Sequence, residues 1–275
     1  MKTVYNYVSA NLAIKDKKEL EFPFLDYGYL YGYGLFESIR VINGNPILID
    51  EHIQRIKRGA IILDIPFYWT ADELKDKATE LIAKNNVSKG ILNFYLTPGD
   101  RSHDPAITDI TDPFLLMVNR EWPNYPEEFY ATLELRQESF QKTQLDRLKT
   151  LSWMKNVLEN RLNKETDDVI LFNDKHEILE TTRANVYFVK DNTIYTPKSP
   201  MILPGIIRQF LLTNQEKIGY DIVERPITFD ELADFDEIFL SNALRGIFPS
   251  STSLKNSASD SLSCFMPSSL STALI

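Results

Sequence analysis

The chain has 275 residues, 43% of them hydrophobic and 25% charged, which predicts a globular protein of one large domain or two modest ones. Its net charge of −9 argues against a general nucleic-acid binder, and no apolar run approaches the roughly 20 residues that span a bilayer. The single cysteine, Cys264, excludes an intramolecular disulfide, and the first twenty residues lack a signal-peptide core. We therefore expect a cytoplasmic protein with no nucleic-acid or membrane partner.

The first half of the chain predicts α and β elements together. Leu35–Val41 is a β-rich run that ends at an Asn43-Gly44 turn signal, with Ile47–Ile49 as the return strand. Asp50 is expected to cap a helix that runs through Ala60. Apolar spacing and β-rich composition predict three further elements: a helix over residues 71–84 and strands over Ile91–Leu96 and Phe114–Val118.

A stretch rich in Pro, Asn and Glu within residues 119–129 predicts a linker. We place it at residues 120–126, between a smaller N-terminal α/β domain (1–119) and a larger C-terminal domain (127–249). Residues 250–275 are Ser-rich, carry few charges and show no periodicity, so they predict a tail that packs weakly or is disordered. The larger domain is expected to hold helices near Leu151–Asn163 and over Gly205–Ile218, and strands over Ala131–Leu135, Val169–Phe172, Val186–Val189, Thr193–Tyr195 and Glu237–Leu240.

Two ionisable side chains in the larger domain are candidates for chemistry. Lys149 is flanked by Leu148 and Leu151, and a lysine amine acts as a nucleophile when burial or a neighbouring cation lowers its pKa. Glu180 ends a predicted strand, where a buried carboxylate could hold a cationic ring nitrogen. Each has an ordinary alternative as a solvated surface residue.

Two further places suit an anion. Arg55 lies on the helix predicted after Asp50, and its planar guanidinium can bind phosphate with two hydrogen bonds, or merely pair with Glu51 on the helix surface. The LPGIIR stretch, residues 203–208, opens a helix whose first N–H groups could seat a phosphate or simply begin a helix. The three histidines have no metal-ligand spacing, so no metal site is expected.

Six stretches together resemble one enzyme family. They are YGYGLFESIRV (31–41), DEHIQRI (50–56), LKTLSWMKNVL (148–158), ILETTRANVYFV (178–189), YTPKSPMILPGIIRQF (195–210) and DEIFLSNALRGIFP (236–249). In this order they resemble the class IV (fold-type IV) aminotransferases, which depend on pyridoxal 5'-phosphate (PLP). This family contains D-amino-acid and branched-chain aminotransferases and 4-amino-4-deoxychorismate lyases. The resemblance implies an α+β, two-domain fold-type IV enzyme, similar to D-amino-acid aminotransferase, with PLP bound between the domains.

The resemblance also implies roles for individual residues. Lys149 would carry the cofactor as a Schiff base, and Glu180 would pair with the pyridine nitrogen. The phosphate would be bound by Arg55, by the backbone N–H groups of Ile206 and Ile207, and by the turn containing Asn242 and Ala243. Tyr31 and Phe36 would line the substrate site, which takes a small amino or carboxylate substrate. Members of this family are typically homodimers, so we expect a homodimer.

Three positions resemble the lyases more than the branched-chain aminotransferases: Met154, Ile207 and the run from Ser241 to Leu244. Arg101 and His103, in contrast, resemble the Arg-x-His pair that binds the substrate carboxylate in D-amino-acid aminotransferases. The leading expectation is a lyase that gives 4-aminobenzoate and pyruvate for folate synthesis. The alternatives are an aminotransferase acting on D- or branched-chain amino acids with a 2-oxo acid acceptor, and a non-catalytic relic of the fold whose only support is the unusual tail.

Overall fold

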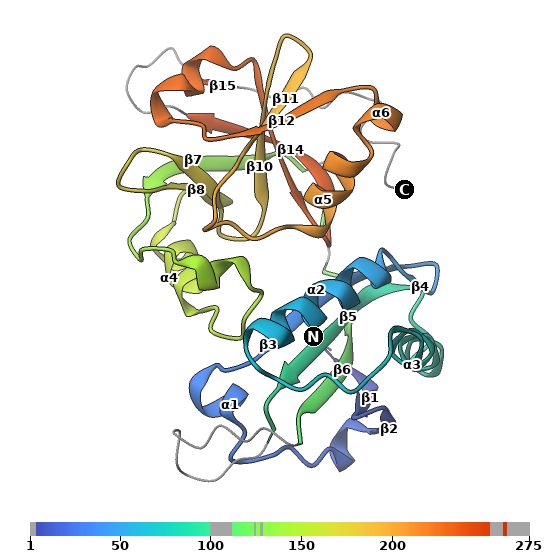
Figure 1. Ribbon diagram of the computed structural model, residues 1–275. Coiled ribbons are helices and arrows are strands. Elements are labelled where there is room, and N and C mark those ends of the chain that lie inside the picture. Colours follow the sequence, from blue (N-terminus) through green and yellow to red (C-terminus); the bar gives the residue numbers. More distant parts are fainter. Residues whose placement is uncertain (1–3, 100–111, 124, 127–128, 254–260, 263–275) are drawn as a thin grey trace. The chain divides into compact units, whose positions relative to one another are not determined.

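The computed structural model describes residues 4–99, 112–123, 125–126, 129–253 and 261–262. The chain forms two compact units, Met1–Asn124 with Leu148–Trp153, and Tyr125–Arg147 with Met154–Ile275. Figure 1 shows the elements of both. The segment that carries Lys149 therefore groups with the first unit, although it follows the predicted linker and was assigned to the larger domain.

The first unit is built on an antiparallel six-stranded sheet in the order β2-β1-β6-β5-β3-β4. The turn predicted at Asn43-Gly44 is confirmed, since both residues have positive φ angles of 49° and 78°. Ile47–Ile49 is not the return strand. A two-residue turn places the pairing residues directly after Gly44, so Asn45 and Pro46 pair with Ile42 and Val41. The strand bounds are β1 Val4–Ala10, β2 Ala13–Asp16, β3 Leu35–Ile42, β4 Asn45–Pro46, β5 Lys89–Thr97 and β6 Phe114–Glu121.

Two long helices of this unit follow the sequence pattern closely. The helix predicted over 71–84 is α3, Ala71–Lys84, which begins with a capping box between Thr70 and Glu73. The predicted cap at Asp50 is wrong, because α2 spans Ile49–Ile62 and Leu48 is its N-cap, while Asp50 lies in the first turn. An acidic side chain in a first turn still stabilises the helix through its dipole. A short helix, α1, spans Tyr27–Tyr31, and a 3-10 turn, η1, spans Lys17–Glu19.

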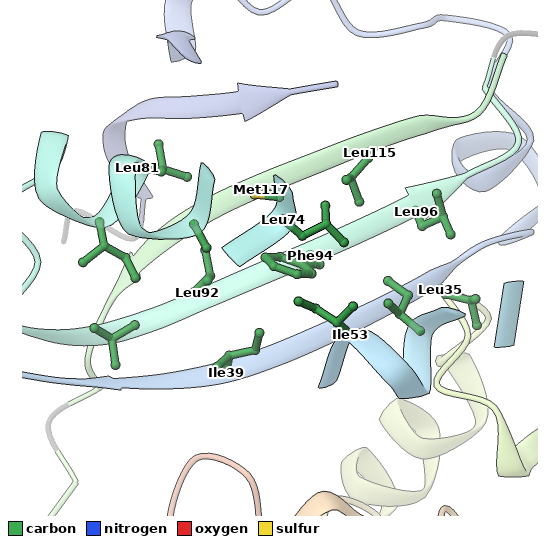
Figure 2. Packing of buried hydrophobic residues seen from close by; sticks show 14 of the residues in the cluster. Leu35, Ile39, Ile53, Leu74, Leu81, Leu92, Phe94, Leu96, Leu115 and Met117 are labelled. Atoms are coloured by element: carbon green, nitrogen blue, oxygen red, sulfur yellow. The ribbon is translucent and has the colours of Figure 1, made fainter. Parts of the chain in front are cut away.

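The core of the first unit lies between one face of the sheet and the helices α2 and α3 (Figure 2). Ile53 of α2 and Leu74 and Leu81 of α3 are almost fully buried against the strands. Burying one such side chain contributes about 1.5–3 kcal/mol. The periodicity of both helices is therefore explained by a single shared core.

The second unit contains a mixed nine-stranded sheet in the order β12-β11-β10-β13-β14-β7-β8-β9, with β15 paired to β14. The β7–β8, β7–β14 and β11–β12 pairs are parallel and the others are antiparallel. The strand bounds are β7 Ala131–Gln137, β8 Asp168–Phe172, β9 Ile178–Thr181, β10 Asn185–Lys190, β11 Thr193–Pro197, β12 Asp221–Arg225, β13 Glu237–Asn242, β14 Gly246–Ser253 and β15 Ser261–Leu262.

The helices of the second unit correct two predictions. The helix expected near Leu151 begins at Met154 (α4, Met154–Leu162), because the preceding residues belong to the first unit. The single helix expected over Gly205–Ile218 is two, α5 Ile206–Thr213 and α6 Gln215–Ile218, which are separated at Asn214. The side-chain amide of Asn214 donates to the carbonyl of Phe210, which competes with helix continuation. Two 3-10 segments, η2 and η3, span Gln144–Arg147 and Phe229–Asp234.

The first residues of the predicted Ser-rich tail are part of the sheet of the second unit. Residues 250–253 complete β14, and Ser250 pairs with Ala131 of β7. The side chain of Ser250 is fully buried, and its hydroxyl donates to the carbonyl of Ile238. A serine suits this position because its hydroxyl can be satisfied inside the sheet. Among the helices of the described residues, none is long and apolar enough to cross a membrane.

Candidate active site

Lys149 is fixed to the edge of the first unit's sheet by backbone hydrogen bonds. The Phe36 amide donates to the Lys149 carbonyl at 2.9 Å, and the Leu151 amide donates to the Gly34 carbonyl at 2.9 Å. Thr150 forms an isolated antiparallel bridge with Leu35, the first residue of β3. Residues far apart in sequence thus become neighbours, which places Lys149 beside Phe36.

Two aromatic rings bound the amine of Lys149. Its Nζ lies 4.4 Å from the centroid of the Phe36 ring and 4.8 Å from that of Trp153. The two rings meet edge to face with centroids 5.4 Å apart. Aromatic faces attract a cation and exclude water from it. Phe36, which the resemblance places in the substrate site, thus lies beside Lys149, and Trp153 joins them although the sequence argument did not single it out.

Glu37, the residue after Phe36 on β3, forms a buried ionic cluster with Arg55 and His52 of α2. Nε of Arg55 donates to Oε1 of Glu37 at 2.7 Å, and Nη2 donates to Oε2 at 2.6 Å. Nδ1 of His52 lies 2.6 Å from Oε2. Glu37 and His52 are each 1% exposed and Arg55 is 8% exposed. Arg55 is thus a buried residue held in a bidentate pair, and its partner is Glu37 rather than Glu51 on the helix surface.

Burial alone would raise the pKa of Glu37, but the charge of Arg55 and the hydrogen bonds from Arg55 and His52 outweigh it and lower the pKa to about 2. Burial lowers the pKa of His52 despite the nearby carboxylate, and the charges of Arg55 and Lys149 lower it further. His52 is therefore neutral at pH 7 and donates from Nδ1 to Glu37, and Arg55 is the cation of the cluster. The carboxylate holds the guanidinium plane in a fixed orientation.

Glu180 is a buried carboxylate of the second unit, on β9. Its Oε1 forms an ion pair with Nζ of Lys142, and its Oε2 accepts from Nδ2 of Asn185 at 3.2 Å. The Leu203 amide lies 3.2 Å from both oxygens. A carboxylate with this many donors is fixed in orientation. Such a group can accept a hydrogen bond from a cationic ring nitrogen.

Asn185 connects Glu180 to the start of α5. The same Nδ2 donates to the carbonyl of Leu203 at 3.0 Å. Gly205, the N-cap residue of α5, lies so close that a Cβ there would collide with Oδ1 of Asn185. Within the described part of the chain no side chain caps this helix, so Ile206 and Ile207 begin it with first-turn N–H groups that suit an anion. The carboxylate and the helix start thus form one connected structure.

A turn at the end of β13 lies close to this helix, since α5 packs against β13. Oδ1 of Asn242 accepts from the amides of Leu244 at 3.1 Å and Arg245 at 2.9 Å. The Asn242 side chain therefore shapes the turn itself, and Ala243 lies within that turn. Ser241, just before it, shares a hydrogen bond with the buried hydroxyl of Tyr187.

The structure treats the predicted substrate residues differently. Tyr31 ends α1, is 60% exposed and packs edge-on against Tyr27. Phe36, in contrast, lies beside the amine of Lys149 together with Trp153. Arg101 and His103 lie outside the described residues. Sequence reasoning missed Glu37 and Lys142. The available signal for Glu37 was a charged residue in phase with Leu35 and Ile39 on the core face of β3.

Comparisons with known proteins identify the family. The model of the amino-transferase class IV family matches residues 34–252. The D-alanine aminotransferase of Bacillus licheniformis is 30% identical over 250 residues, which cover 87% of this chain and 85% of that protein. The D-alanine aminotransferase of Listeria monocytogenes serotype 1/2a is 26% identical, with 88% and 86% covered.

A solved structure shows the same fold. The branched-chain amino acid aminotransferase from Escherichia coli superimposes with a TM-score of 0.80 at 20% identity, covering 90% of this chain and 85% of that one. The predicted α+β fold-type IV architecture is thereby confirmed.

The residues present suit PLP chemically. Lys149 offers an amine beside apolar ring faces, Glu180 offers a fixed carboxylate, and α5 offers an uncapped N-terminus of the kind that binds phosphate. Among the described residues, no cluster of three His, Cys, Asp or Glu side chains is arranged to hold a metal ion. The chain belongs to the class IV aminotransferase family, and it is a PLP-dependent enzyme of the aminotransferase or lyase type.

Proposed function

We propose that this enzyme converts 4-amino-4-deoxychorismate into 4-aminobenzoate and pyruvate, a step in folate synthesis, with Lys149 as the residue that bonds to PLP. The observation that carries the proposal is the position of the Lys149 amine over the faces of Phe36 and Trp153. Two flat apolar surfaces beside the reacting amine suit a substrate that carries a six-membered ring.

PLP, when bound, supplies an electron sink for the reaction. Lys149 removes the proton from the ring carbon that bears the substrate amine, and the bond between the neighbouring ring carbon and the enolpyruvyl oxygen breaks, so that the ring becomes aromatic. Lys149 then gives the proton to the methylene carbon of the departing enolpyruvate, which leaves as pyruvate. Glu180 would hold the protonated pyridine nitrogen of PLP. Phe36 and Trp153 exclude water from the amine while the proton is held there.

The phosphate of PLP is proposed to bind to groups from two places in the chain. Arg55 contributes a guanidinium whose orientation is fixed by Glu37. The N–H groups of Ile206 and Ile207 and the turn at Asn242 and Ala243 contribute neutral donors.

The second candidate function is transamination of a D-amino acid. It is favoured by the 30% identity to a D-alanine aminotransferase over most of the chain. Under this function Arg101 and His103 bind the substrate carboxylate, whereas Tyr31 is proposed to face the active site under either function. Under the lyase function Arg101 binds a carboxylate of the substrate and His103 matters less. The presence of Lys149, Arg55 and Glu180 together argues against a non-catalytic relic.

We also propose a homodimer. The first unit exposes large aromatic side chains around α1, with Phe24 77% and Tyr29 69% exposed. Large aromatic side chains gathered in this way are typical of protein interfaces. A second copy of the chain is the proposed occupant of this surface.

The test of the lyase assignment is release of pyruvate from 4-amino-4-deoxychorismate in the absence of any 2-oxo acid acceptor. We expect pyruvate and 4-aminobenzoate to form in equal amounts. Pyruvate is measured with a coupled lactate dehydrogenase assay, and 4-aminobenzoate is measured by its absorbance. Lys149→Ala should abolish both products, because the amine proposed to bond to PLP is then missing. Lys155→Ala is the matched control, because Lys155 bonds to Asp146 and the Gln141 carbonyl and has no proposed catalytic role.

Two outcomes would assign the chemistry differently. Pyruvate release that depends wholly on an added acceptor would reject the lyase. Formation of glutamate from D-alanine or leucine with 2-oxoglutarate, and none of the lyase products, would establish the aminotransferase. Loss of activity in Lys155→Ala with retention in Lys149→Ala would show that the wrong lysine was chosen.

A further inference from the structure

Lys142 is a buried cation that the proposed mechanism does not use. It is 5% exposed, and its Nζ forms an ion pair with Oε1 of Glu180, which is 6% exposed. Lysine is almost never buried to this degree unless it is paired. Its own amide donates to a carboxylate oxygen of Glu138 at 3.0 Å, which fixes the backbone at this position. The ammonium is thus held against the carboxylate by its surroundings.

The contacts of Glu180 divide between the two carboxylate oxygens. Lys142 binds Oε1, Asn185 binds Oε2, and the Leu203 amide lies 3.2 Å from each. Of these three donors, Lys142 carries a charge and the other two are neutral amides. A neighbouring ammonium favours the ionised form of a buried carboxylate, and it also weakens the attraction of that carboxylate for any second cation.

We propose that Lys142 is a positioning residue that, through Glu180, sets how strongly the enzyme prefers a protonated ring nitrogen in its cofactor. This inference rests on the proposed role of Glu180 at the pyridine nitrogen. The carboxylate is shared between the ammonium and the pyridinium, so the pyridinium is bound less tightly than by an unshared carboxylate. Lys142 thereby lowers the protonation of the ring nitrogen, and with it the electron-withdrawing power of the ring, without contact with the cofactor.

The test compares PLP with 1-deazapyridoxal 5'-phosphate, in which the ring nitrogen is replaced by C–H. Full-length enzyme is equilibrated with a mixture of both, borohydride fixes the bound molecules to the protein, and mass spectrometry gives their ratio. A nearby charge shifts a proton equilibrium by about 1–3 pH units, so Lys142→Met should raise the preference for PLP about tenfold or more. The reason is that the pyridinium then no longer shares the Glu180 carboxylate with the Lys142 ammonium.

Three further variants show whether the effect comes from the charge of Lys142. Lys142→Arg keeps the charge and should keep the wild-type ratio of the two cofactors. Lys142→Gln removes the charge but keeps a hydrogen-bond donor, and it should shift the ratio as Lys142→Met does. It replaces Lys142→Met in the test if the methionine variant does not fold. Lys175→Met removes an exposed lysine of the same unit and should change nothing. An unchanged ratio in both Lys142→Met and Lys142→Gln overturns the inference, as does an equal change in Lys175→Met.

Glu180→Gln separates this inference from the proposed function. It should lower the preference for PLP, and in that background Lys142→Met should have no further effect. If Glu180→Gln leaves the preference unchanged, Glu180 does not contact the ring nitrogen and the proposed role itself fails. If Glu180→Gln lowers the preference but Lys142→Met alone does not raise it, the role of Glu180 stands and that of Lys142 is rejected.

Discussion

Glu37 occupies a position on β3 where the alternation of the strand calls for an apolar side chain. Leu35 and Ile39, its neighbours on the same face, belong to the core. The carboxylate is tolerated there because Arg55 and His52 supply hydrogen bonds from α2. Breaking such a buried pair from one side leaves the other charge without compensation, which is more costly than never burying the pair.

Glu37→Gln should therefore destabilise the protein by about 3 kcal/mol at pH 7, as measured by urea unfolding. The folded-state pKa of Glu37, about 2, lies below its ordinary value of 4.5. The stabilisation is thus complete above pH 4.5 and is lost as the pH falls towards 2. The difference between wild type and variant should shrink over that range. Glu51→Gln, on the exposed side of α2, should show neither effect.

The residues of the candidate site were only partly predictable. The roles proposed for Lys149, Glu180 and Arg55 come from the resemblance of the stretches that contain them to the class IV family. Their partners could not be read from the sequence. Glu37 lies 18 positions from Arg55, and Lys142 lies 38 positions from Glu180. Such pairings are set by tertiary packing, which local pattern does not encode.

At the scale of single elements, the start of α5 depends on the close approach of the Gly205 backbone to the side chain of Asn185. Gly205→Ala would place a methyl group against Oδ1 of Asn185. Asn185 would have to move, and its hydrogen bonds to Glu180 and Leu203 would be lost. We expect the affinity for PLP to fall about tenfold or more and the stability to fall by about 1–3 kcal/mol.

Gly219→Ala is a matched control for this effect. Gly219 ends α6 with a φ of 75°, and no atom of the described residues lies within 4 Å of the position a Cβ would take. The variant should lose about 1 kcal/mol through backbone strain alone. Its affinity for PLP, measured by fluorescence titration, should equal that of the wild type. Equal losses of affinity in both variants would contradict the link between Gly205 and the cofactor.

Elements with strong periodicity and clear caps were predictable, and those that depend on distant contacts were not. The helix over residues 71–84 was correct to the residue, since Thr70 and Glu73 mark its start and Leu74, Ala78, Leu81 and Ile82 share one face. The start of α4 was misplaced because Leu148–Trp153 pairs with the first unit. The break at Asn214 coincides with a side-chain hydrogen bond to the Phe210 carbonyl, within a segment of otherwise helical pattern.

At the scale of the whole molecule, β14 holds the second unit together. It pairs with β13 on one side and β7 on the other, so it connects two halves of the nine-stranded sheet. A chain that ends after residue 249 would lose the pairs that Ser250, Ser251 and Thr252 make with β7. We expect such a chain to be insoluble or strongly destabilised.

A chain that ends after residue 253 keeps these pairs and loses those with β15. It should remain folded and should melt at a higher temperature than the shorter chain in calorimetry. Equal melting temperatures for the two truncated chains would show that residues 250–253 contribute nothing to the sheet. The low-complexity composition of this stretch concealed the strand, because serine hydroxyls can be buried when they find a carbonyl, as Ser250 does.

The return of Leu148–Trp153 to the first unit also has an evolutionary consequence. The chain passes between the units at residues 124–125, 147–148 and 153–154, so neither unit is one continuous stretch of gene. A single recombination event with its breakpoint between β3 and Leu148 would place one parent's β3 beside the other parent's lysine segment. Exchange of a whole unit requires several breakpoints, so we expect changes of substrate in this lineage to arise from point substitutions rather than from shuffled modules.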